Sequence, residues 1–255
     1  MLTFVKRNPA APPGFFACEA AGLQWLSCAN GASVARVVAC DGTSLTLERL
    51  QSGRPKREHA HAFGRALATT HDAGSQEWGA PPDGWSGPGY FGPLHQPLPM
   101  SYKPQDTWGQ FYAAQRLRPM LERASHQLGA EATALVEHVI ERCAAGAFDD
   151  GETPARLHGD LWSGNLMWTP DGVVLIDPAA HGGHRETDLA MLDLFGCPHL
   201  DAIIAGYQEV HPLTPGWRDR VPLHQLYPLL AHVVLFGTGY AQATAAAAEL
   251  VGGSN

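Results

Sequence analysis

One segment narrows the possible folds of this chain more than any other: residues 158–165, with the sequence HGDLWSGN. It places a carboxylate, Asp160, and an amide, Asn165, in a stretch whose two glycines predict a loop. The apolar run VVLI follows and ends in a second carboxylate, Asp177. Short apolar runs on either side of the loop predict strands. The chain therefore has to fold so that a polar loop between strands brings three oxygen-bearing side chains together.

The composition restricts the class of protein. With 17 basic and 25 acidic residues among 255, the net charge is −8, and the clustered Lys and Arg that track nucleic acid are missing. The five cysteines form no CxxC pair, which argues against a disulfide framework or a zinc site and favours a reducing compartment. No apolar run is long enough to span a membrane, and the first residues do not resemble a signal peptide. We expect a cytoplasmic protein with no nucleic-acid and no membrane partner.

The first fifty residues predict a small sheet with one helix. The expected elements are strands at 2–6, 34–40 and 44–50 and a helix at 15–29. Asp41-Gly42 is typical of the hairpin turn between the last two strands. Residues 1–52 are therefore expected to form a small β-rich lobe.

Residues 53–255 predict a larger, mostly helical lobe. The expected helices are 58–71, 106–127, 130–146, 186–195, 199–210 and 219–236, and the expected strands lie within 156–176. A Gly- and Pro-rich stretch at 73–105 carries Trp78, Trp85, Tyr90 and Phe91, for which we expect core packing rather than a place in a sugar site. The Ala-rich tail 241–255 is expected to fray. The predicted fold class is α+β with two lobes.

The polar loop and the strand end carry the parts that phosphoryl transfer from ATP requires. A carboxylate orients the acceptor hydroxyl, and carboxylate or amide oxygens suit the hard cation Mg²⁺. Protein kinases arrange these groups as HRD-x-x-x-x-N followed by DFG. Here Gly159 stands in place of the Arg and Asp177-Pro-Ala in place of Asp-Phe-Gly, with the same spacing from Asp160 to Asn165.

Four segments together resemble one family. They are HGDLWSGN at 158–165, LIDPA at 175–179, GHRETDLAMLDLFG at 183–196 and GYQEVHPL at 206–213. They are similar to the fructosamine kinase (ketosamine-3-kinase) family, which belongs to the aminoglycoside-phosphotransferase branch of the protein-kinase-like fold. The resemblance extends over essentially the whole chain and implies that two-lobed fold here.

The resemblance also implies roles for single residues. Asp160 would be the catalytic base, and Asn165 and Asp177 would be the Mg²⁺ ligands. In the first lobe, Lys6 would contact the α- and β-phosphates of ATP, and Glu19 would hold the lysine in place.

Further candidates have less distinctive surroundings. Glu48, Arg49 and Leu50 leave the last strand of the first lobe and look like the hinge whose backbone meets adenine, although an ordinary strand end would look the same. Trp162 is a candidate for packing against the acceptor.

Four residues near the loop admit a structural role. His184 and Arg185 could face the substrate or belong to a hydrogen-bonded loop, and the residues alone do not decide between these. His158 is expected to be buried and to organise the backbone. Asp188 is expected to accept hydrogen bonds from the backbone of the catalytic loop, as a helix-borne aspartate does in kinase-like folds.

One departure from the family pattern concerns the segment that binds the phosphates of ATP. The family has a strand, a glycine-containing loop and a second strand before the lysine strand, whereas five residues precede Lys6 here. We expect either that translation starts upstream of Met1 or that the first lobe is truncated and ATP binding is impaired.

The resemblance implies an ATP-dependent kinase that phosphorylates the 3-hydroxyl of a ketosamine, a fructose- or ribulose-type sugar attached to an amine. Free glycated amines and glycated lysines on proteins are both candidate substrates, and the implied role is deglycation. Two alternatives stay open: a kinase of the same fold acting on an aminoglycoside or an amino alcohol, and a non-catalytic nucleotide-binding protein. A polycationic aminoglycoside would require an acidic substrate surface, of which Asp149-Asp150 is a weak hint.

Overall fold

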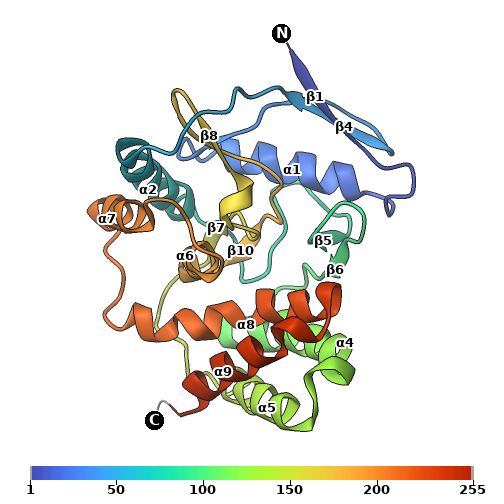
Figure 1. Cartoon of the computed structure of the whole chain (residues 1–255), viewed down its shortest axis with the longest axis vertical. Helices are drawn as coiled ribbons and strands as arrows, with labels where there is room; N and C mark the ends of the chain where they lie inside the picture. The colour runs from blue at the N-terminus through green and yellow to red at the C-terminus, as the bar shows by residue number, and fades with distance from the viewer. Residues whose placement is uncertain (1, 254–255) are drawn as a thin grey trace.

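The first lobe contains the small sheet that the sequence predicts. The computed structural model describes residues 2–253. Its first elements are β1 (Thr3–Arg7), α1 (Phe15–Ser27), β2 (Ser33–Val34), β3 (Val37–Cys40) and β4 (Ser44–Glu48). Strands pair antiparallel in the order β1–β4–β3, and α1 lies beside this sheet (Figure 1). Phe16 and Leu23 of α1 pack with Leu45 of β4 in one buried apolar cluster, so the sheet and the helix form a common core.

The predicted strand 34–40 is wrong as a single element. It is divided, because β2 pairs in parallel with β9 (Gly172–Leu175) of the second lobe whereas β3 pairs with β4. Between them, the buried Ala35 donates its N–H to β9, and the carbonyl of Arg36 accepts from the N–H of Glu48 (2.9 Å each). The chain changes partner at these two residues, and the hydrogen bonds of β2 connect the two lobes.

The second lobe is mostly helical, and one large apolar cluster within it lies at the end of the molecule opposite the β1–β4–β3 sheet (Figure 1). Its longer helices are α2 (Arg57–Asp72), α4 (Arg118–Leu128), α5 (Ala130–Ala144), α6 (Arg185–Leu194), α7 (Leu200–Val210), α8 (Trp217–Phe236) and α9 (Ala241–Gly252). The shorter elements are β5 (Gly89–Phe91), β6 (Leu98–Met100), α3 (Trp108–Phe111), the π-helix η1 (Tyr112–Leu117), β7 (Ala155–Leu157), η2 (Ser163–Asn165), β8 (Leu166–Thr169), β10 (His181–Gly183) and η3 (Thr238–Tyr240). The α+β prediction with a small sheet-rich lobe and a larger helical lobe is confirmed. Within residues 2–253, no helix has both the length and the apolar character needed to cross a bilayer.

Two predicted elements of the second lobe differ in part from the structure. The segment expected as one helix at 106–127 is helical over 108–128, but it contains the π-helix η1 between α3 and α4. The tail expected to fray forms α9, because its alanines favour helix and Ala248 and Val251 are buried in the core of the lobe. Residues 254–255 lie outside the described residues.

The stretch 73–105 is anchored by its aromatic side chains. Trp78 and Phe91 are buried in the core of the second lobe, which confirms core packing for these two residues. Within the stretch, β5 and β6 form an antiparallel hairpin. The hydroxyl of Tyr90 donates to the carbonyl of Pro13 (2.8 Å), so the hairpin of the second lobe is attached to the start of α1 in the first.

Helices α2 and α7 pack closely at two glycines. A methyl group at Gly64 would lie 1.9 Å from the carbonyl oxygen of Ile203, and one at Gly206 would lie 2.1 Å from that of His61. We expect Gly64→Ala to lower the free energy of unfolding by roughly 1–3 kcal/mol, because a backbone carbonyl cannot move away alone and the helices must separate. Gly42→Ala, at a turn with open space around it, is the control and should leave the urea midpoint unchanged. Equal midpoints for the two variants would contradict this packing.

Candidate active site

The catalytic loop, residues 158–165, is stabilised by a buried carboxylate on α6. Asp188 accepts hydrogen bonds from the backbone N–H groups of His158 (2.8 Å) and Gly159 (2.9 Å). The imidazole of His71 on α2 hydrogen-bonds the same carboxylate (3.1 Å), and its other nitrogen hydrogen-bonds the hydroxyl of Tyr207 (2.8 Å). Burial alone would raise the pKa of Asp188, but these hydrogen bonds outweigh it and lower the pKa. The structural role expected for Asp188 is confirmed.

His158 organises the same loop from within. Its Nδ1 accepts the N–H of Asp160 (3.2 Å), so Nε2 carries the proton and donates to the carbonyl of Ile176 (2.9 Å). The residue is fully buried, and burial lowers its pKa. His158 therefore links the loop to the strand end that carries Asp177, as the sequence predicts.

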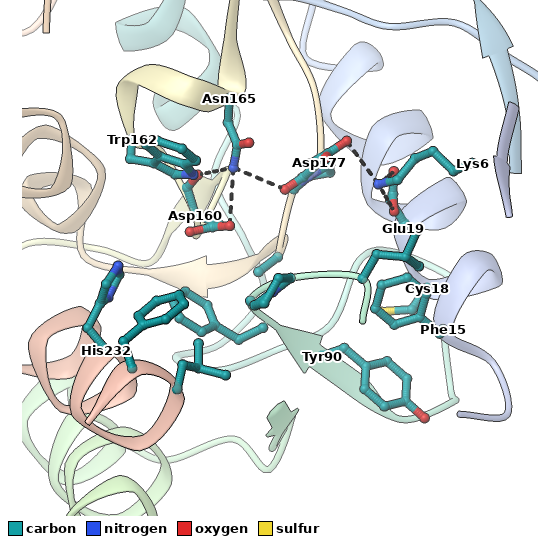
Figure 2. Close-up of a pocket in the computed structure, with 18 of the residues that line it drawn as sticks. Lys6, Phe15, Cys18, Glu19, Tyr90, Asp160, Trp162, Asn165, Asp177 and His232 are labelled. Atoms are coloured by element: carbon teal, nitrogen blue, oxygen red, sulfur yellow. Dashed lines mark hydrogen bonds and ion pairs between the residues drawn. The ribbon is translucent and has the colours of Figure 1, made fainter. Parts of the chain in front are cut away.

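Asp160 and Asn165 lie side by side in this loop (Figure 2). The Asn165 amide donates to the backbone carbonyl of Asp160 (2.7 Å) and to its carboxylate (3.1 Å). Burial raises the pKa of Asp160 to about 7, and the nearby carboxylates of Asp177 and Asp188 contribute to the shift. A carboxylate with a pKa near neutrality can accept a proton from a hydroxyl and release it again.

Asp177 connects the loop to the first lobe. Its carboxylate lies 3.0 Å from the ammonium of Lys6, which in turn donates to both carboxylate oxygens of Glu19 (2.7 and 2.9 Å). Burial alone would lower the pKa of Lys6, but the two carboxylates outweigh it and raise the pKa. The backbone of Asp177 has a φ of 56°, a left-handed conformation that is rare outside glycine and is found at functional sites. Three predicted site residues from distant parts of the chain thus meet, as Figure 2 shows.

The donor atoms at this point fit Mg²⁺. Asn165 offers an amide oxygen and Asp177 a carboxylate, and these hard oxygen donors belong to the kind that Mg²⁺ prefers. The side chain of Asp177 is 41% exposed, so its carboxylate keeps room for a cation and its waters. The residues present therefore suit the metal that the sequence implies.

A cavity of about 570 Å³ opens beside Asp160. Trp162 lies on one side of the carboxylate and His232 of α8 on the other (Figure 2). The ring of Trp162 lies over Gly164, where a methyl group would fall within 2.2 Å of the indole. Besides these residues, the lining contains side chains of α1, of the β5–β6 hairpin, of the residue after α6, of the end of α8 and of η3: Phe15, Cys18, Tyr90, Phe91, Leu94, Phe195, Leu235, Phe236 and Tyr240. Tyr90 and Phe91 thus line the cavity in addition to packing, which corrects the expectation that they serve packing alone.

His184 and Arg185 do not line the cavity. His184 begins α6, where its Nδ1 accepts the N–H of Glu186 and its Nε2 bonds Asp150 (3.2 Å). Arg185 is buried and its guanidinium donates to Asp72 (2.9 Å) among other acceptors. Of the two interpretations that the sequence leaves open, the structure favours a hydrogen-bonded loop for both residues. Substrate contact by His184 or Arg185 stays a prediction.

The predicted hinge residues also lie outside this cavity. Glu48 accepts from the N–H of Arg36 (3.1 Å), and the N–H of Arg49 donates to the carbonyl of Leu2 (3.0 Å). Leu50 packs against the apolar cluster of the first lobe. An adenine contact by this segment, which would use backbone groups, stays a prediction.

Several cavity residues carry no recognisable sequence signal. Phe195 directly follows α6, His232 and Phe236 lie near the end of α8, and Tyr240 lies in η3. In the sequence they are single aromatic residues in helical or turn segments, where core packing is the ordinary interpretation. Only the approach of α6 and α8 to the catalytic loop shows that they face a common space.

Comparisons with known proteins agree with this geometry. The model of the family described as "Fructosamine kinase" matches residues 2–251. A "Probable ketoamine kinase" of Synechocystis sp. is 36% identical over 245 residues, which cover 94% of this chain and 79% of that protein. The crystal structure of a "putative fructosamine-3-kinase" from Thermobifida fusca superimposes with a TM-score of 0.89 at 47% identity, covering 98% of this chain and 85% of the other.

The fold is also that of more distant kinases. The streptomycin–ATP complex of the aminoglycoside phosphotransferase APH(2'')-IIa has a TM-score of 0.60 at 13% identity, over 98% of this chain and 86% of the other. At this identity the likeness concerns the fold alone. The chain belongs to the fructosamine kinase family and is an ATP-dependent small-molecule kinase.

Proposed function

We propose that the protein transfers the γ-phosphoryl group of ATP to the 3-hydroxyl of a ketosamine. Membership of a family of ketoamine kinases supports a sugar-amine acceptor. The observation that carries the proposal is the cavity beside Asp160, in which a carboxylate with a pKa raised to about 7 faces aromatic walls. Aromatic faces bind the C–H surfaces of a sugar, and a single well-placed carboxylate selects one of its hydroxyls.

The side chains around the cavity divide the chemistry between them. The carboxylate of Asp160 accepts the proton of the acceptor hydroxyl as its oxygen bonds to the γ-phosphorus and the bond to the β-phosphate oxygen breaks. Lys6, held by Glu19, contacts the α- and β-phosphates. Mg²⁺, when bound by Asn165 and Asp177, would neutralise charge on the phosphate oxygens. Most of the rate enhancement comes from positioning the acceptor hydroxyl and the γ-phosphoryl group, because the transition state requires little covalent chemistry from the protein.

Two residues are placed to hold the sugar. Trp162 is 40% exposed and its ring faces the cavity, so it offers an apolar surface to a sugar ring. The Nδ1 of His232 bonds the carbonyl of Pro228 (2.7 Å), which places the proton on Nδ1. Burial lowers the pKa of His232, so the ring stays neutral and its Nε2 is an acceptor for a sugar hydroxyl.

An aminoglycoside acceptor fits this cavity less well. Within residues 2–253, the carboxylates that line it are Glu19, Asp160 and Asp177. Glu19 is paired with Lys6, and the other two serve the reaction. The pair Asp149-Asp150, which could have formed an acidic surface, is used internally: Asp149 accepts the N–H of Gly109 (2.8 Å), and Asp150 bonds His184. A polycation would find no further negative partner here.

The proposed physiological role is deglycation of small ketosamines or of glycated lysines on proteins. Phosphorylation at C3 places a leaving group next to the carbon that carries the carbonyl, and such a product is expected to lose the phosphate and release the amine.

A substrate panel tests the proposed function. The protein is incubated with ATP and Mg²⁺ and with a fructosamine, a ribulosamine, an aminoglycoside or an amino alcohol, and ADP release is measured. We expect release with a ketosamine, and the phosphorus–proton coupling in the product should place the phosphate on C3. Turnover of the aminoglycoside or the amino alcohol alone, or phosphate on another carbon, would overturn the proposal.

Removing the two proposed metal ligands should have unequal effects. Asp177→Ala removes a full negative charge and Asn165→Ala only a dipole, so Asp177→Ala should weaken Mg²⁺-dependent nucleotide binding more. Titration of each variant with Mg²⁺ in the presence of a fluorescent ATP analogue measures the difference. Equal effects, or none, would show that the ligand roles are wrong.

A further inference from the structure

The open end of the cavity is lined by aromatic side chains that the reaction itself does not use. They are Phe195, Phe236 and Tyr240, called the aromatic rim below. Phe195 is 37% exposed and Phe236 57% exposed. The ring centre of Tyr240 lies 6.5 Å from that of Phe195 and 6.2 Å from that of Phe236, so the three rings form one surface. Exposed apolar surface that continues a binding cavity is typical of ligand contact.

Two helix ends hold the aromatic rim in place. Phe195 directly follows α6 and precedes Gly196, whose φ of 76° turns the chain away. Phe236 is the last residue of α8 and precedes Gly237, which has a φ of 86° and lets η3 return Tyr240 to the same side. The rim is therefore built on two helix ends and a short turn, and it can discriminate by shape and charge.

The charges around the cavity favour one class of amine. Within residues 2–253, the Lys, Arg, His, Asp and Glu side chains that line it are Lys6, Glu19, Asp160, Asp177 and His232. Lys6 is the single permanent cation among these side chains, and Glu19 and Asp177 already pair with it. A carboxylate at the rim would thus meet no positive partner. An ammonium group would be attracted by the aromatic faces.

The covalent structure of a ketosamine brings its amine to this place. The nitrogen is attached to C1 and the reacting hydroxyl to C3, so a sugar seated at Asp160 carries the amine substituent only two carbons away. The rim adjoins His232, whose ring centre lies 4.7 Å from that of Phe195 and 4.9 Å from that of Tyr240. A substituent on a sugar held between Trp162 and His232 therefore reaches the rim.

We propose that the aromatic rim binds the amine substituent of the ketosamine and selects neutral or cationic amines over those that carry a carboxylate. This inference rests on the proposed function and adds the class of amine to it.

Three fructosamines test the proposal: those of butylamine, benzylamine and 4-aminobutyrate. The butylamine and 4-aminobutyrate derivatives have equal numbers of carbon atoms in the substituent and differ in a terminal methyl or carboxylate. We expect kcat/KM to be on the order of 10-fold higher for the butylamine derivative, through KM. Phe195→Ala and Phe236→Ala should bring this ratio towards one by raising KM for the butylamine and benzylamine derivatives, with little change in kcat. Val210→Ala is the control, because Val210 is an exposed apolar residue on α7 outside the cavity lining.

The outcomes separate this proposal from the one it rests on. Turnover of all three compounds with equal kcat/KM, or an amine preference that both rim variants retain, would overturn the rim proposal and leave the proposed function standing. Absence of ADP release with every fructosamine would overturn the proposed function and the rim proposal with it. A preference that is present in the wild-type protein and in Val210→Ala but lost in both rim variants would support the rim.

Discussion

Asp160→Asn is expected to lower kcat by roughly 10²–10⁴-fold while the fold and the affinity for ATP stay nearly unchanged. The amide keeps the size of the carboxylate but cannot accept the proton of the acceptor hydroxyl. The backbone of the loop does not depend on this side chain, because Asp188 and His158 hold it through main-chain groups. Steady-state kinetics with a ketosamine and nucleotide titration of the same variant measure the two quantities. A variant that retains most of the wild-type kcat would contradict the role of Asp160 as the catalytic base.

The same carboxylate should govern the pH dependence of the reaction. Its pKa is raised to about 7, and the ionised form is the one that accepts a proton, so kcat/KM should rise with pH through about 7. The folded state binds the proton of the Asp160 carboxyl more tightly than the unfolded state, because the pKa of this carboxyl is higher in the folded state. Stability contributed by the protonated form is therefore present at low pH and is lost as the pH rises through about 7.

Asp160→Asn should accordingly leave the Tm at neutral pH unchanged or higher, because it removes the cost of ionising a buried group. A lower Tm for the variant, or a wild-type kcat/KM that does not vary with pH in this range, would contradict the raised pKa.

The catalytic loop could be predicted from sequence because its parts are close together along the chain. The spacing from Asp160 to Asn165 and the apolar strand before Asp177 are local features, and the structure brings all three together. Lys6 and Glu19 could be predicted only through the family resemblance, since a lysine on a strand and a glutamate on a helix are common exposed residues. The structure shows them paired and largely buried.

The walls of the cavity could not be predicted for a physical reason. Phe195, Phe236 and Tyr240 meet only because α6 and α8 end near each other in space, and a helical apolar pattern does not show which helix ends meet. The division of the strand at 34–40 has a similar cause, because the pairing of β2 with β9 joins segments far apart in sequence. The apolar pattern correctly predicts a helical segment at 106–127, but it does not distinguish the π-helix η1 from the α-helices on either side of it.

Asp188→Asn is expected to destabilise the protein by about 3 kcal/mol and to reduce kcat by roughly 10²-fold, since it damages the support of the loop and not the reacting group. The carboxylate accepts three hydrogen bonds, from the N–H groups of His158 and Gly159 and from His71. An asparagine of the same size has one acceptor oxygen, and its NH₂ group would face a buried donor. Leaving a buried donor unpaired costs about 1–3 kcal/mol, and Asp160 would shift with the loop.

Asp193→Asn is the matched control, because Asp193 is an exposed aspartate on the same helix and its side chain hydrogen-bonds only at the surface, to Gln225 (3.3 Å). Urea unfolding of both variants measures the stability, and kinetics of both measure the rate. The loss of kcat in Asp188→Asn should exceed any change in KM for ATP, because Lys6 and Glu19 lie in the first lobe and do not depend on this carboxylate. If the two variants unfold at the same urea concentration and turn over equally fast, the catalytic loop does not need Asp188, and the position of Asp160 must be maintained by His158 and Asn165 alone.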